Sequence, residues 1–237
     1  MWQGDPDEGE EWAGRLLELS RQAGLEHGVS LAIHMFGIAA SMQGDHDRAR
    51  ALHEESLVHA RRQDDGWLLS VATNNLGSMY MEEGDFERAA ELFEESLAIG
   101  EARGDLDRRA RALTNLGYAA HGLGEGARAH ELLRRGLAAA EEIGLVESQL
   151  WALFGIASYE AEAGDALAAA RLLGRAKELQ SDLRAGRDDL AEEVERRTLA
   201  RLHDALGRER LASELAAGAA LSLEDAIDLA LGRQPAD

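Results

Sequence analysis

The chain has 237 residues, of which 45% are apolar but only 5% aromatic, and it contains two prolines and no cysteine. This composition is typical of a long helical protein and excludes disulfides and thiol chemistry. No apolar run approaches the roughly 20 residues of a membrane helix, so we expect no membrane contact and a cytoplasmic location. The formal net charge of −20 opposes direct nucleic-acid binding and would steer basic partners towards the chain.

The first expected element is a helix from Pro6 to about Ala23, with Asp5 as its N-cap. It corresponds to the second helix of the pairs that follow, but its own first helix is missing. Two explanations are open: the chain is a piece of a longer protein cut at a repeat boundary, or this helix is an N-terminal cap. We favour the first, because four residues would leave much apolar surface to cover: Trp12, Leu16, Leu17 and Leu19.

Four helix pairs are expected to follow at a period of forty residues, over residues 26–62, 66–103, 106–143 and 146–180. A turn glycine, a small residue and a leucine recur at this step: Gly44, Gly84, Gly124 and Gly164; Ala49, Ala89, Ala129 and Ala169; Leu52, Leu92, Leu132 and Leu172. A fixed period of this length indicates a solenoid of stacked helix pairs.

The period breaks after residue 180. The pattern then predicts helices over residues 188–205, 209–217 and 223–231, the last one capped by Ser222 and closed by Gly232. We therefore expect one solenoid domain over residues 1–237, with repeats over 4–180, an irregular helical C-terminal cap over 181–232 and a disordered tail over 233–237.

The second helix pair carries a signature in which a bulky residue and a glycine are followed by an aromatic, an alanine, an aromatic and a small residue: Leu76-Gly77, Tyr80, Ala89, Phe93 and Ser96. In these positions the chain resembles the tetratricopeptide repeat (TPR) family. The forty-residue unit is similar to the extended repeats of kinesin light chains, although Thr73 stands where the signature often has Trp. The resemblance implies an all-α fold, a right-handed TPR superhelical solenoid of helix-turn-helix repeats.

Two C-terminal segments, ALGRERLA at residues 205–212 and GAALSLEDA at residues 218–226, resemble the end of the repeat arrays of large bacterial STAND-class ATPase transcriptional regulators. This resemblance implies that the chain is the sensor array of such a regulator. The ATPase and DNA-binding domains would then lie outside these residues.

In a TPR array the first helices line a concave groove, and the resemblance places eight candidate peptide-binding residues there: His34, Asn74, Asn75, Arg111, Asn115, Tyr118, Trp151 and Phe154. Many peptide-binding repeats place an Asn at the position of Asn75 and Asn115, where a carboxamide can both donate to and accept from a ligand backbone. The alternative for both is a capping or solvated Asn. The three aromatic residues form either an apolar anchor pocket or part of the core.

The eight histidines have no recognised metal-ligand spacing, and the sequence contains neither a phosphate-binding Gly-rich loop nor a nucleophile elbow. We therefore expect no enzyme activity, no catalytic residue, no metal and no cofactor.

Three functions remain. The first is a scaffold that binds a protein or peptide, basic or apolar, in the groove. The second is a regulatory domain that senses a small molecule near Trp151 and Phe154. The third is self-association as a homodimer, in which the unpaired helix around Trp12 and Leu16 docks on another copy.

Overall fold

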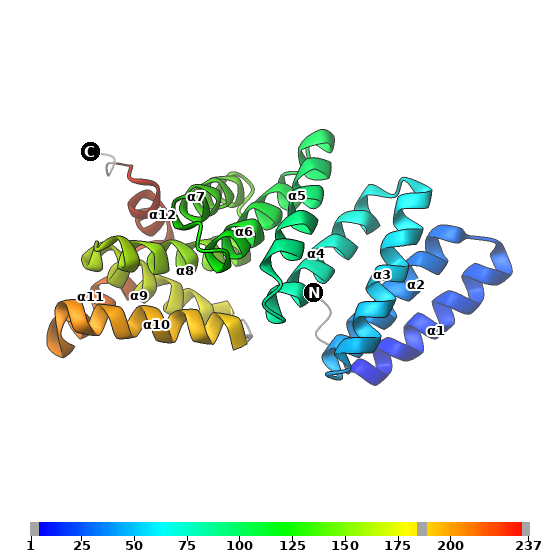
Figure 1. The fold of residues 1–237 in the computed structure, drawn as a ribbon, viewed down its shortest axis with the longest axis horizontal. Coiled ribbons are helices and arrows are strands. Elements are labelled where there is room, and N and C mark those ends of the chain that lie inside the picture. Colours follow the sequence, from blue (N-terminus) through cyan, green and yellow to red (C-terminus); the bar gives the residue numbers. More distant parts are fainter. Residues whose placement is uncertain (1–4, 184–188, 234–237) are drawn as a thin grey trace. The chain divides into compact units, whose positions relative to one another are not determined.

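The computed structural model describes residues 5–183 and 189–233. These residues form α-helices that follow one another in antiparallel pairs, twelve helices within the described part of the chain (Figure 1). The all-α repeat architecture is thus confirmed. The chain divides into two compact units, Met1–Ala102 and Arg103–Asp237, and each is described by itself; the expectation of a single solenoid domain stays a prediction.

The first unit holds five helices, whose bounds agree closely with the repeat pattern: α1 (Pro6–Ala23), α2 (Glu26–Met42), α3 (His46–Gln63), α4 (Gly66–Glu82) and α5 (Phe86–Arg103). The expected N-cap of α1 is confirmed, because the Asp5 carboxylate accepts a hydrogen bond from the Asp7 N–H at 3.0 Å. Each helix pair turns at a left-handed glycine, Gly44 with φ 77° and Gly84 with φ 79°, a conformation that side chains with a Cβ rarely adopt.

The pairs of the first unit pack through glycines of their first helices. A Cβ added at Gly77 would lie 2.6 Å from the Phe93 ring, and one added at Gly37 would lie 2.6 Å from the His53 ring. The aromatic rings therefore occupy the space that a larger residue on the first helix would need. This explains why the glycine recurs at the period of the repeat.

The second unit holds the remaining helices: α6 (Leu106–Gly122), α7 (Gly126–Glu142), α8 (Val146–Ala163), α9 (Ala166–Leu183), α10 (Asp189–Leu206), α11 (Arg208–Ala219) and α12 (Leu223–Leu231). Leucines of α7, α8 and α9 form one core with Leu202, Leu211 and Ile227 of the last three helices. Two glycines bring α9 and α11 into backbone contact, because a Cβ at Gly218 would lie 2.0 Å from the Arg171 carbonyl oxygen and one at Gly174 would lie 2.2 Å from that of Leu215.

The end of the chain packs on this core. The Ser222 hydroxyl caps α12 by accepting from the Asp225 N–H at 3.0 Å, as predicted. Arg233 pairs with Glu141 of α7 at 2.9 Å, so this residue of the expected tail has a fixed partner. The rest of the tail, residues 234–237, lies outside the described residues, as do residues 184–188 of the expected cap.

Candidate ligand-binding faces of the first helices

In the first unit, the neighbouring first helices α2 and α4 present half-exposed residues that recur at helical spacing. We call this set the α2/α4 face: Leu31, Met35, Ile38 and Met42 on α2, and Trp67, Val71, Asn75 and Ser78 on α4. His27 and Asp65 pair at the starts of the two helices. A face of this kind is largely apolar and remains open to solvent.

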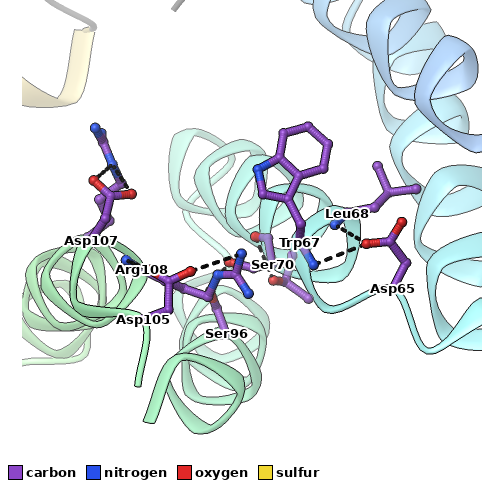
Figure 2. A network of polar contacts seen from close by, with 10 residues as sticks. Asp65, Trp67, Leu68, Ser70, Ser96, Asp105, Asp107 and Arg108 are labelled. Carbon is purple, nitrogen blue, oxygen red and sulfur yellow. Dashed lines mark hydrogen bonds and ion pairs between the residues drawn. The ribbon is translucent and has the colours of Figure 1, made fainter. Parts of the chain in front are cut away.

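Trp67 is the most prominent side chain of the α2/α4 face. Asp65 caps α4 by accepting from the N–H groups of Trp67 and Leu68, both at 3.1 Å (Figure 2). The indole points away from this capped turn and is 50% exposed, and Met42 at the other end of the face is 45% exposed. Large exposed apolar side chains close together on a folded unit often mark a contact surface.

Asn75 lies between these apolar residues and is half-buried. Among the described residues, its carboxamide has no side-chain hydrogen-bond partner. Asn74 and Asn115 both have partners. Of the three candidate asparagines, Asn75 is therefore the one whose donor and acceptor are available to a ligand.

His34 does not belong to this face. Its side chain is only 2% exposed and its ring lies 5.3 Å from that of His53. Burial, followed by repulsion from His53, lowers the pKa of His34 to about 3, and burial lowers the pKa of His53 to about 4. The expectation that His34 lines a ligand site is corrected: it is a neutral core residue at neutral pH, because α2 turns position 34 towards α3 and position 35 towards solvent.

In the second unit, α6 and α8 are the neighbouring first helices. The Tyr118 hydroxyl donates to the Trp151 carbonyl oxygen at 2.7 Å, which fixes the two helices to each other. Tyr118, Trp151 and Asn115 are half-buried. Trp151 stacks on Phe154 with 5.9 Å between the ring centroids.

Phe154 is only 7% exposed and belongs to the core of the second unit. Of the two alternatives for the aromatic residues, the core applies to Phe154, which is therefore removed from the candidate site. Trp151 keeps an accessible edge that Phe154 supports from the core side.

Arg111 also lies on the α6 side of this surface, where acidic groups hold it. Its Nε lies 3.2 Å from both carboxylate oxygens of Asp107, and its Nη1 lies 3.4 Å from Glu147 (Asp107 in Figure 2). The guanidinium is thus already neutralised. A ligand carboxylate would have to displace two existing ion pairs, so this end of the face favours a neutral or basic ligand over an acidic one.

The sequence reasoning did not single out Met42 and Trp67 as site residues. The signal that could have identified them is the register itself. Trp67 lies four residues before Val71, and Met42 lies four residues after Ile38, so both continue the half-exposed row by one helical turn.

Within the described ranges 5–183 and 189–233, no group of three or more His, Cys, Asp or Glu side chains could hold a metal ion. In the same part of the chain, no helix is both long and apolar enough to cross a membrane.

Two solved structures have a similar fold. The crystal structure of BtubC (BKLC) from P. vanneervenii shares 20% sequence identity with a TM-score of 0.65, over 99% of this chain and 96% of that chain. A crystal structure of nearly identical TPR-like repeats of a Podosopora anserina kinesin light chain shares 18% identity with a TM-score of 0.52, over 78% of this chain and 100% of that chain. The comparison with curated proteins finds no match.

Antiparallel helix pairs at a fixed period, with half-exposed first-helix faces, define a helical-repeat scaffold. The tetratricopeptide repeat family matches residues 1–61 and 68–142, which is more than half of the chain. The chain therefore belongs to this family, whose domains generally serve as protein-interaction scaffolds and are typically non-catalytic.

Proposed function

We propose that this protein is a non-enzymatic scaffold that binds a peptide or protein segment on the α2/α4 face. The observation that carries the proposal is the unpaired, half-buried carboxamide of Asn75 between apolar side chains that remain exposed. A carboxamide in this position can hold a ligand backbone, while Trp67 and Met42 receive its apolar side chains.

The charge of the first unit supports a basic and apolar ligand. Residues 1–102 contain 21 acidic and seven basic residues, so this unit carries −14 of the net charge of −20. Such a field raises the association rate of basic segments. The apolar face then supplies the short-range contact, and the methionines Met35 and Met42 can adapt to more than one ligand side chain.

The test is a peptide selection followed by affinity measurements. A random peptide library displayed on phage is selected on the purified chain, and the enriched peptides are synthesised and titrated by fluorescence polarisation. We expect enriched peptides to combine apolar and basic residues, and we expect Asn75→Ala and Trp67→Ala each to weaken binding by about tenfold, the effect of one lost hydrogen bond or apolar contact.

The matched control is Val58→Ala, because Val58 is an exposed apolar residue on the second helix α3. This variant should bind like the wild type. Enriched peptides that bind Asn75→Ala and Trp67→Ala with wild-type affinity would overturn the proposal.

The regulator context is a finer hypothesis that depends on the resemblance of residues 205–212 and 218–226 to the repeat arrays of STAND-class regulators. The corresponding sensing site would be the accessible edge of Trp151, which Phe154 supports. A small molecule that quenches tryptophan fluorescence in the wild type but not in Trp151→Phe would support this hypothesis. Quenching of both proteins to the same extent would contradict it.

A further inference from the structure

Helix α1 carries a second apolar surface, away from the α2/α4 face. Trp12 is 51% exposed and Leu19 is 63% exposed, Leu16 is half-buried and Ala23 is exposed. The spacing of these four residues is four, three and four, which places them in one stripe along the helix. We call this set the α1 stripe.

In the other repeats, the same positions of the second helix pack against the first helix of their own pair. Leu52, equivalent to Trp12, packs on a cluster that contains Ala40 of α2. Leu92 packs on a cluster that contains Leu76 of α4. Ala139, equivalent to Leu19, packs in a cluster with Ala110 of α6. The α1 stripe is therefore the face that a second helix uses for helix–helix contact.

The α1 stripe is not shaped for a regular first helix of this array. Position 16 is equivalent to Ser56, Ser96 and Gly136, which are small because the first helix comes close there. A Cβ on Gly136 would already lie 2.7 Å from the Thr114 Oγ1 and 3.1 Å from the Thr114 backbone nitrogen. Leu16 is too large for this packing, and Ala13 in turn is smaller than the His53 and Phe93 that fill the same position elsewhere.

The charges beside the α1 stripe indicate what can cover it. Glu8, Glu11, Arg15 and Glu18 are exposed, and they follow one rim of the stripe, with the two Glu residues in the first half and Arg15 near the centre. A parallel second copy would place each charge beside its own like charge. An antiparallel second copy would place Arg15 of one chain near Glu18 of the other, twice in a symmetric pair.

We propose that two copies of this chain associate through an antiparallel pairing of their α1 stripes. The bulky Trp12, Leu16 and Leu19 of one copy fill the stripe of the other, and reciprocal Arg15–Glu18 pairs set the orientation. One pair of helices gives a small interface compared with the roughly 1,200 Å² of a stable complex. The dimer is therefore concentration-dependent, and it leaves the α2/α4 face free.

The test measures the mass of the full chain by light scattering and sedimentation equilibrium from the low micromolar to the submillimolar range. We expect a monomer–dimer equilibrium for the wild type. Leu19→Glu should raise the dimer dissociation constant about 100-fold or more, because it places two uncompensated charges in the apolar contact. Val58→Glu, a charge on another exposed apolar position, in α3, should leave the constant unchanged.

A charge exchange tests the orientation. Arg15→Glu and Glu18→Arg should each weaken the dimer, whereas the double variant Arg15→Glu/Glu18→Arg should restore most of the affinity. Circular dichroism checks that each variant keeps its helix content. A wild-type monomer at every concentration, or a dimer that Leu19→Glu does not weaken, would overturn the proposal; a double variant no better than the single ones would overturn the antiparallel arrangement.

Discussion

The buried pair His34 and His53 should make the first unit sensitive to mild acid. The two rings lie 5.3 Å apart and are both almost fully buried, and the Nδ1 atom of each lacks a hydrogen-bond partner among the described residues. Burial lowers the pKa of His34 to about 3 and that of His53 to about 4. The folded state therefore keeps both rings neutral at a pH at which an unfolded chain would protonate them.

The sign of the effect follows from proton linkage. Because the pKa of each histidine is lower in the folded chain than the usual value of about 6.5, the unfolded state binds more protons, and stability is lost as the pH falls below 6.5. The loss continues until the pH reaches the folded values near 4 and 3. Between pH 8 and pH 5, each histidine should reduce the free energy of unfolding by about 2 kcal/mol, or about 4 kcal/mol for the pair.

The assay is urea unfolding at pH 8, 7, 6 and 5, combined with hydrogen exchange of peptides from α2 and α3. The informative variant is His53→Phe, because Phe93 occupies the equivalent position against Gly77. This variant should lose about half of the pH dependence. His46→Gln, a change at an exposed histidine of the same helix, is the control and should keep all of it. An unchanged slope between pH 7 and pH 5 in His53→Phe would refute the reasoning.

Three further predictions concern the second unit and can be checked by the same urea titrations. Gly218→Ala should destabilise the chain by about 1 to 3 kcal/mol or more, because its Cβ would meet the backbone of Arg171, whereas Gly14→Ala, whose Cβ has its nearest neighbour at 4.0 Å, should be neutral or stabilising; equal effects would contradict this. Ser222→Ala should cost about 1 kcal/mol through loss of the α12 cap, and Ser222→Asp should restore it. Arg233→Ala should cost less than about 1 kcal/mol and less still in high salt, since its pair with Glu141 is partly exposed; a larger loss that salt does not reduce would show that Arg233 does more than form a surface ion pair.

The helix boundaries could be predicted from the sequence because the repeat samples each environment several times. Gly44, Gly84 and Gly124 all adopt the left-handed conformation that ends a first helix or its turn, so the reading of one turn applies to the others. The caps Asp5 and Ser222 were predictable for a related reason, since capping depends on a few local residues and not on the packing of distant helices.

The faces of the first helices were harder to predict. Successive residues of a helix point about 100° apart, so a shift of one position moves a side chain from solvent to core. His34 and Phe154 stand at the buried position, and Asn75 stands at the neighbouring half-exposed one. All three residue types occur on either side of such a boundary, and composition alone cannot assign them. Contacts with the second helices decide which side each residue takes.

The departures from the repeat are the most informative residues in the chain. Position 174 is equivalent to Glu54, Glu94 and Arg134, which are polar or charged outer residues, but Gly174 replaces them and allows α11 to pack in backbone contact. Leu16 similarly replaces a small residue and closes the standard contact with a first helix, and His53 replaces an aromatic or leucine and adds a titratable group to the core. A repeat makes each such exception visible, because the neighbouring copies show what the position requires when it only has to support the array. The residues that differ from this requirement are therefore the ones at which a special contact or property of this chain should be sought, and both the α1 stripe and the histidine pair lie at such positions.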